Sequence, residues 1–243
     1  MTPSRLRKKD QDRTNRGPAK SLWREYGEAL LIALILALVI RAFFVQAFSI
    51  PSGSMQPTLL IGDYLLVNKL SFGIRNPLTN KVWISIGKPQ RGDVVVFIFP
   101  QDPSKDYIKR VVGLPGDKVE IRDKKVLING KAVQSAGAVY TDDTLIPLGQ
   151  SPRDNLAPMT VPTNAYFVMG DNRDHSYDSR FWGFVPDDAL RGKAFVIYFS
   201  WQGQQGTSFF PSLLGGLKGL ILHLSWDTES FRLRWDRLGT LIK

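Results

Sequence analysis

The chain contains no cysteine, and only two of its 243 residues are histidine. Without cysteine it forms no disulfide bonds and carries out no thiol chemistry. This composition fits an exported protein, although it does not prove export. We expect neither a cofactor nor a metal ion in the functional site.

A basic stripe of the kind that binds nucleic acid is also absent. The formal net charge is +10, and residues 1–25 supply half of it with eight basic and three acidic side chains. The remaining basic residues are spread thinly and form no arginine-rich run. We therefore expect membrane lipid, and no nucleic acid, as the partner of the basic segment.

Only one strongly apolar run is present. Residues 29–40 are all apolar, and Ala42 to Phe48 continue the run after Arg41, with Gln46 as the only polar residue. A helix over Ala29–Phe48 would be about 30 Å long, the thickness of one bilayer core. Arg41 is costly inside lipid, but its side chain can reach the headgroups if it lies near the outer edge.

These two segments predict the domain organisation and the topology. By the positive-inside rule, residues 1–25 form a basic cytoplasmic tail and residues 26–48 a single transmembrane anchor. Residues 49–243 then form an extracytoplasmic domain at the cell membrane, whether plasma or inner membrane. A cleavable secretory signal ending near Val45-Gln46-Ala47 is an alternative. In both cases most of the chain is exported.

The exported part has the sequence pattern of a mostly β protein. Strand-length runs of β-branched and aromatic residues are separated by turn residues, and Asn129-Gly130 indicates a tight hairpin. From 135 to 164 these signals weaken, which predicts a loop-rich inserted subdomain. The runs are 64–68, 93–99, 107–112, 118–122, 125–128, 131–133, 165–169 and 194–199.

A nucleophile candidate follows directly after the apolar run. Ser52 and Ser54 flank Gly53 and lie between Pro51 and Pro57. Glycine allows another chain to approach closely, and proline fixes the backbone, so such a turn can present a serine oxygen to a substrate.

The serine needs a general base, and three residues are candidates. His175 has three aspartates nearby in sequence, at 171, 174 and 178, so a Ser/His/Asp set is possible. His223 has no acidic neighbour closer than Asp227. Lys109 lies in an apolar strand next to Arg110, and since adjacent strand residues face opposite sides, we expect one of this pair to point inward. A buried lysine loses its proton more readily and becomes a usable base.

Five ordered segments closely resemble the motifs of bacterial type I signal peptidase, a Ser/Lys protease family. The resemblance covers about residues 29–199 and implies a membrane-anchored serine endopeptidase with an antiparallel β-sheet catalytic domain. The segments are Pro51-Ser-Gly-Ser-Met-Gln-Pro-Thr-Leu59, Gly62-Asp-Tyr-Leu-Leu-Val-Asn-Lys69, Arg91-Gly-Asp-Val-Val-Val-Phe97, Tyr107-Ile-Lys-Arg-Val-Val-Gly-Leu-Pro-Gly-Asp117 and Gly170-Asp-Asn-Arg-Asp-His-Ser-Tyr-Asp-Ser-Arg180.

The resemblance assigns a role to each matching residue. It implies Ser54 as nucleophile, Lys109 as general base and Ser176 as the hydroxyl that orients the lysine amine. The Ser54 backbone N–H and the Ser52 hydroxyl would form the oxyanion hole. The structural support of the site would come from Asp178 paired with Arg180, and from Asp171 and Arg173. His175 has no required role in this family.

The family cleaves signal-peptide-bearing exported precursor proteins after a small-x-small motif, which implies shallow apolar subsites. Matching substrate-binding positions are Phe48, Ile50, Pro51, Leu59, Tyr107, Val168 and Met169, with Met55 and Ile108 completing the apolar shell of the lysine.

Two other functions remain open: an exported Ser/His/Asp protease, and a non-enzymatic membrane-tethered β-domain that binds a partner. The apolar stretches 72–78 and 82–86 are expected to form a patch that rests on lipid. Residues 209–224 form a further apolar stretch, interrupted by glycine and proline, which would lie on a membrane surface or within the core.

Overall fold

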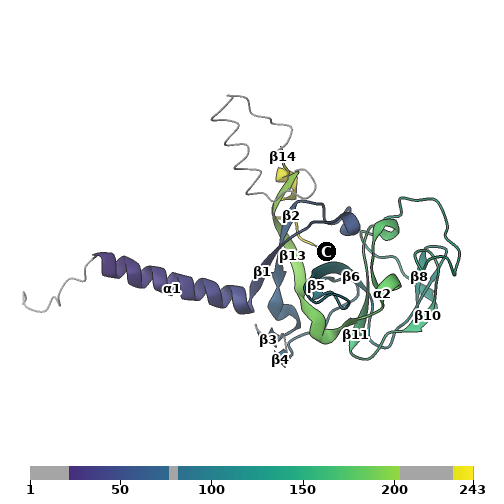
Figure 1. The fold of residues 1–243 in the computed structure, drawn as a ribbon, viewed down its shortest axis with the longest axis horizontal. Helices are drawn as coiled ribbons and strands as arrows, with labels where there is room; N and C mark the ends of the chain where they lie inside the picture. The colour runs from purple at the N-terminus through teal and green to yellow at the C-terminus, as the bar shows by residue number, and fades with distance from the viewer. Residues whose placement is uncertain (1–21, 77–81, 203–231, 243) are drawn as a thin grey trace, which may run out of the picture. The chain divides into compact units, whose positions relative to one another are not determined.

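The computed structural model describes residues 22–76, 82–202 and 232–242, so the apolar stretch 209–224, His223 and most of the basic tail lie outside the described residues. The chain divides into two compact units, Met1–Arg41 and Ala42–Lys243. The described part of the first unit is helical, and the second unit is built mainly from strands (Figure 1).

Helix α1 spans Leu22–Phe43, and its apolar side chains are exposed along most of its length. Its segment Trp23–Phe43 is the one helix of the described residues that is long and apolar enough to cross a membrane. The expected helix over Ala29–Phe48 is wrong at both ends. Helix α1 ends at Phe43 because residues 45–49 pair with a neighbouring strand instead of continuing the helix.

An antiparallel sheet of eight strands forms the main part of the second unit (Figure 1). Its order is β1-β2-β13-β5-β6-β11-β12, with β14 added alongside β13. The long strand β13 pairs with β2, β5 and β14, so it connects the two halves of the sheet. The bounds are β1 Val45–Ser49, β2 Asp63–Asn68, β5 Val94–Ile98, β6 Asp106–Gly113, β11 Ala165–Met169, β12 Val185–Pro186, β13 Leu190–Gln202 and β14 Arg232–Leu233.

Two smaller sheets complete the unit. A four-stranded sheet has the order β10-β7-β8-β9, with β7 Lys118–Arg122, β8 Lys125–Ile128, β9 Lys131–Ala132 and β10 Leu156–Thr160. Strands β3 (Ile74–Arg75) and β4 (Val82–Ile84) pair by themselves. Asn129 and Gly130 both have positive φ, 53° and 79°, which is the geometry of a two-residue hairpin turn and confirms that prediction.

The strands predicted from sequence are all present, within a few residues at each end. The sequence pattern did not reveal β1, β3, β4, β10, β12 and β14. The stretch 135–164 contributes only β10 as a strand and is otherwise loop, while the small sheet that β10 joins already begins at Lys118.

Short helices occupy the connections, where the functional loops lie. They are η1 Gly53–Met55, η2 Lys69–Phe72, η3 Arg173–His175, α2 Ser179–Trp182, η4 Asp187–Ala189 and η5 Trp235–Arg237.

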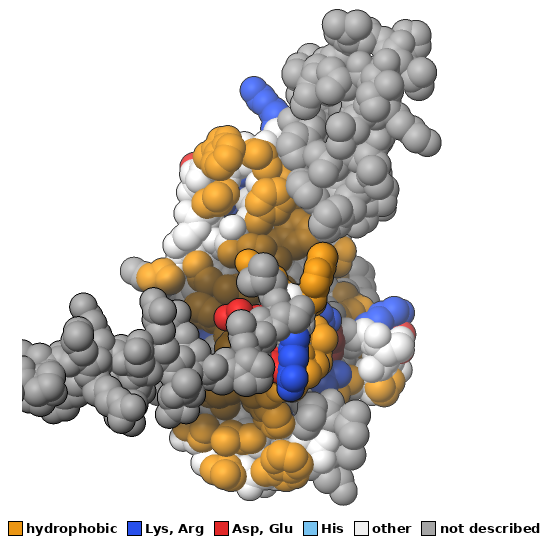
Figure 2. Space-filling model, turned by 90° about the vertical axis from the view of Figure 1, so that its left-hand side faces the viewer, with side chains coloured by type: hydrophobic (Ala, Val, Ile, Leu, Met, Phe, Trp, Pro, Cys, Tyr) orange, Lys and Arg blue, Asp and Glu red, His pale blue; other side chains and the backbone are white. Residues whose placement is uncertain are grey.

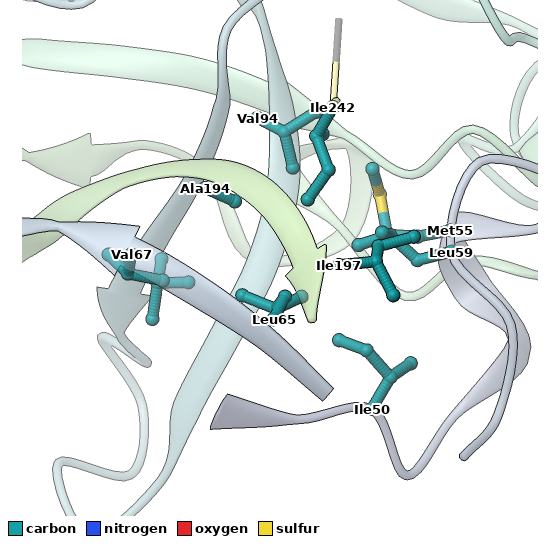
Figure 3. Packing of buried hydrophobic residues seen from close by; sticks show 10 residues of the cluster. Ile50, Met55, Leu59, Leu65, Val67, Val94, Ala194, Ile197 and Ile242 are labelled. Atoms are coloured by element: carbon teal, nitrogen blue, oxygen red, sulfur yellow. The ribbon is translucent and has the colours of Figure 1, made fainter. Parts of the chain in front are cut away.

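One core cluster ties the segment after β1 to the main sheet (Figure 3). Ile50, Met55 and Leu59 come from this segment, and they pack with sheet residues such as Leu65 and Ile197. Burying a side chain of this size contributes about 1.5–3 kcal/mol, so the short helix η1 is held firmly although it has a single turn. The other members are Val67, Val94, Val96, Ala194 and Ile242.

The C-terminal segment reinforces the same region. Arg237 forms an ion pair with the fully buried Asp63 at 2.6 Å and donates a hydrogen bond to the Thr58 carbonyl at 2.9 Å. Arg234 donates to the Ile61 carbonyl at 2.8 Å. These contacts, together with the packing of Ile242 in the core, hold the segment between β1 and β2 in place.

Hydrophobic side chains gather on the face that Figure 2 shows, with few charged side chains among them. Val82, Trp83, Ile84 and Ile86 are all exposed. Phe72, expected in the same patch, is instead 4% exposed and belongs to the core. Among the residues of this patch that the structure describes, the large exposed apolar side chains therefore lie on β4 and just after it.

Candidate active site

Ser54 lies in η1, between the edge strand β1 and strand β2. The Leu59 N–H donates to the Met55 carbonyl, and the Gly62 N–H to the Ile50 carbonyl, at 2.9 and 3.0 Å. With Met55 and Leu59 anchored in the core, this segment presents Ser54 as a partly exposed residue of a rigid turn.

Lys109 comes from β6 and meets Ser54 directly. Its Nζ lies 2.6 Å from Ser54 Oγ and also donates to the Ile108 carbonyl at 3.1 Å. Two residues 55 positions apart in sequence are thereby brought into hydrogen-bond contact, as a nucleophile and its base require.

The surroundings of Lys109 favour its neutral form. Only 4% of the residue is exposed, and this burial lowers the pKa of its amine from 10.5 to about 8. The carboxylates of Asp178 and Asp171 oppose this shift in the pKa, but burial outweighs them. About a tenth of the amine is therefore unprotonated at pH 7, far more than for an ordinary lysine.

Arg110, the neighbour of Lys109, is also buried, which corrects the expectation that only one of the pair points inward. It faces the other side of β6 and binds Asp171 with two hydrogen bonds of 2.7 and 2.8 Å. Asp171 also accepts a hydrogen bond of 2.5 Å from the Thr58 hydroxyl. This network joins β6 to the segment that carries Ser54, and so it holds nucleophile and base at a fixed separation.

A second buried ion pair supports the loop after β11. Arg180 and Asp178 lie 2.8 Å apart, and Asp178 also accepts a hydrogen bond of 3.0 Å from the Gly170 N–H. Burial alone would raise the pKa of Asp178, but Arg180 and these hydrogen bonds hold the pKa below its usual value. Arg173 is 2% exposed and donates to the Gly170 carbonyl at 3.1 Å. The four residues expected to support the site therefore all lie behind it.

Ser176 is buried near the site, where its hydroxyl helps to lower the pKa of Asp178, and it is not among the hydrogen-bond partners of Lys109. The expected hydrogen bond from Ser176 to the Lys109 amine is therefore not formed in this structure. Gly170 keeps the space between the two serines open, because a Cβ at this position would collide with Ser176 Oγ and with the Ser54 carbonyl.

A cleft of about 640 Å³ opens beside Ser54. Of the predicted substrate-binding residues, Phe48, Ile50, Pro51, Tyr107 and Ile108 line it, together with Ser52 and Lys109. The cleft wall does not include Met55, Leu59, Val168 and Met169, all of which are almost fully buried in core clusters. These four residues are close to site residues in the sequence, but the sequence did not show that their side chains point away from the cleft.

The cleft also has polar and aromatic walls that sequence reasoning missed. Asp106 could have been expected in the cleft, because it precedes Tyr107 on β6. Val96 could not, because it reaches the cleft only through the pairing of β5 with β6, in which it lies opposite Ile108. The further lining residues are Ser49, Gly53, Gln56, Ile61, Asn172, His175 and Tyr177.

His175 lines the cleft but is not arranged as a base for Ser54. Its Nδ1 lies 3.2 Å from Thr141 Oγ1 and 3.3 Å from Asn172 Oδ1. Within the described chain it has no hydrogen bond to Ser54 or to an aspartate, so a Ser/His/Asp set is not assembled. In these same residues no group of three or more His, Cys, Asp or Glu side chains is placed to hold a metal ion.

Comparisons with known proteins agree on one family. The family profile described as signal peptidase, peptidase S26, matches residues 23–201. A signal peptidase I of Pseudomonas fluorescens is 45% identical, with 73% of this chain and 72% of the relative covered. A probable signal peptidase I-2 of Synechocystis is 38% identical, covering 79% of this chain and 80% of that one. A crystal structure of a signal peptidase I from Enterococcus faecalis V583 is 33% identical, covers 45% of this chain and 98% of that chain, and has a TM-score of 0.35.

Proposed function

The chain belongs to the signal peptidase family, peptidase S26, and on this basis we propose that Ser54 and Lys109 form the dyad with which it removes signal peptides from exported precursor proteins. One observation carries the assignment of the dyad. The only basic group in hydrogen-bond contact with Ser54 Oγ in the described chain is a buried lysine amine whose pKa is lowered to about 8.

The chemistry follows from this pair. The neutral Lys109 amine takes the proton of Ser54 Oγ as this oxygen attacks the carbonyl carbon of the scissile bond. The resulting ammonium returns the proton to the departing amine of the mature protein, which leaves an ester between Ser54 and the signal peptide. The amine then removes a proton from water, and the hydroxide attacks the ester carbon. The ammonium returns this proton to Ser54 Oγ as the ester bond breaks, which restores the dyad and releases the signal peptide as a carboxylic acid that ionises in solution.

The negative charge that develops on the substrate carbonyl oxygen must be stabilised by hydrogen-bond donors. The Ser54 backbone N–H and the Ser52 hydroxyl are proposed for this role, because both residues line the cleft and Ser52 makes no capping hydrogen bond to helix η1. A side-chain hydroxyl that is not committed to the helix is free to turn toward the substrate.

The cleft fits an extended peptide with small side chains at two positions. Ile50, Pro51 and Ile108 make its wall beside Ser54 apolar, and Phe48 and Val96 extend that wall. Alternate residues of an extended chain point to the same side, so two small residues separated by one are accommodated on one wall. This supports cleavage after a small-x-small motif.

We place the chain as a single-pass protein of the cell membrane, with its basic N-terminal segment in the cytoplasm and the β unit outside. The eight basic residues among the first 25 support this orientation. Phe43, the last residue of α1, contacts Trp83 of the exposed patch with ring centroids 6.4 Å apart. The patch thus adjoins the helix end, where an apolar surface can rest on lipid.

The decisive experiment measures cleavage of a precursor with an Ala-x-Ala site by the purified full-length protein. Wild type should release the mature protein, and Ser54→Ala and Lys109→Ala should both be inactive while binding the precursor as before. His175→Asn should retain most of the activity. Full activity of Lys109→Ala, or inactivity of His175→Asn, would replace the dyad by a histidine mechanism.

A further inference from the structure

Lys69 makes two contacts at the point where helix α1 joins the β unit. Its backbone N–H donates to the Phe44 carbonyl at 2.9 Å, and its Nζ donates to the Ala42 carbonyl at 2.8 Å. Ala42 belongs to the last turn of α1, and Phe44 is the single residue between the helix and β1. Neither contact belongs to the catalytic site described above.

The pairing of β1 with β2 explains why Lys69 reaches this junction. Val45 and Asn68, the last residue of β2, are register partners, so Lys69 at the start of η2 comes next and meets Phe44. Its N–H adds one more hydrogen bond to the ladder beyond the end of β1. Its half-buried side chain then continues to the helix end.

The chemistry of a helix end favours this contact. The last carbonyls of a helix have no partner within it, and they carry a partial negative charge that attracts cations. Near lipid an unpaired carbonyl is especially costly, and a lysine ammonium can bind it while staying close to the headgroups.

We propose that Lys69 is a positioning residue that fixes the distance of Ser54 from the end of the membrane helix, and that it thereby helps to select the bond cut in a membrane-inserted precursor. The inference rests on the proposed anchoring of the chain by α1. From Phe44 the chain runs through β1, five hydrogen-bonded residues or about 16 Å, to the turn that holds Ser54. Within the second unit, which begins at Ala42, Lys69 ties both Ala42 and Phe44 to the end of β2 and so holds the start of this path.

A fixed path matters only for a substrate that is held in the same membrane. Such a precursor presents its peptide bonds at set distances from the lipid, and a nucleophile at a set distance meets one of them at high local concentration. A soluble peptide approaches from any direction and does not sense the junction. The two substrates therefore separate positioning from chemistry.

The test uses full-length protein in lipid vesicles with three variants. Lys69→Met removes the ammonium and keeps the length of the side chain, and Lys69→Arg keeps a cation. Lys125→Met is the matched control, because Lys125 is exposed on β8 in the small sheet. The substrates are a soluble Ala-x-Ala peptide and a membrane-inserted precursor with a second Ala-x-Ala site four residues beyond the first.

For Lys69→Met we expect soluble-peptide cleavage within about twofold of wild type and about fivefold slower precursor cleavage, the factor that corresponds to the typical net contribution of one hydrogen bond. Mass spectrometry of the products should show a larger fraction cut at the second site. Lys69→Arg should restore the wild-type distribution, and Lys125→Met should leave it unchanged.

An equal loss on both substrates, or an unchanged product distribution, would overturn the proposal. Failure of the proposed function itself would appear differently, as a lack of Ser54-dependent cleavage of the soluble peptide by wild type.

Discussion

The rate of peptide cleavage should follow the protonation of Lys109. The perturbation is a change of pH alone, applied to the wild-type protein. Burial lowers the pKa of the Lys109 amine to about 8, and only the neutral amine can accept the proton of Ser54. Activity should therefore be low in mild acid and rise to a plateau in alkaline solution.

The lowered pKa sets the size of the effect. With a pKa of about 8, the neutral fraction of Lys109 is about 1% at pH 6, about 10% at pH 7 and about 90% at pH 9. The rate should thus increase about ninefold from pH 6 to pH 7 and about fivefold from pH 7 to pH 8, and it should level off above pH 9. An ordinary exposed lysine would still be almost wholly charged at pH 8.

The assay is kcat/KM for a soluble fluorogenic Ala-x-Ala peptide, because this quantity reports groups that titrate in the free enzyme. The same curve is measured for His175→Asn, whose imidazole lines the cleft but binds Thr141 and Asn172 rather than Ser54. We expect the two curves to have the same midpoint. A flat profile between pH 6 and pH 9, or a midpoint that disappears with His175, would refute the lysine base.

Three further predictions concern single side chains. Lys109→Met should raise the free energy of unfolding at pH 7 by about 3 kcal/mol, since the difference between a pKa of 10.5 and one of about 8 measures the cost of burying the ammonium. In urea titrations this gain should shrink as the pH rises from 8 to 10.5. In this range the folded wild type has lost the Lys109 proton while its unfolded chain still binds it, so the stability of the wild type rises with pH. Gly170→Ala should reduce kcat at least a hundredfold, since its Cβ would displace Ser54 or Ser176, whereas Gly27→Ala, in open space, should have no effect on peptide cleavage. Ser52→Ala should lower kcat about 10²–10³-fold with KM little changed, and a collapse of affinity at constant kcat would contradict the oxyanion assignment.

Much of the fold could be predicted because its strands have a strong local pattern. The runs 118–122 and 125–128 coincide with β7 and β8. In the first run β-branched residues alternate with charged ones, the second is a short apolar run after a lysine, and turn residues separate the two. The end of α1 could not be predicted in this way. Val45 to Phe48 are apolar enough to extend a membrane helix, and only pairing with β2 makes them a strand.

The site could be predicted where a residue violates its local pattern. Lys109 interrupts an apolar strand, and it is indeed buried against Ser54. The direction of the apolar side chains could not be predicted. Met55 and Leu59 follow Ser54 closely but pack into the core, because η1 turns them away from the cleft. The part played by Arg237 was missed as well, since its partner Asp63 is 174 residues away in sequence.

The contacts of the C-terminal segment also determine the order in which parts of the β unit can assemble during synthesis. The turn that carries Ser54 is complete only when Arg237 has bound Asp63 and Ile242 has entered the core. A nascent chain contains Ser54 and Lys109 long before it contains these residues. During synthesis these supporting contacts of the turn are therefore the last to form, after Ser54, Lys109 and the strands between them have been made.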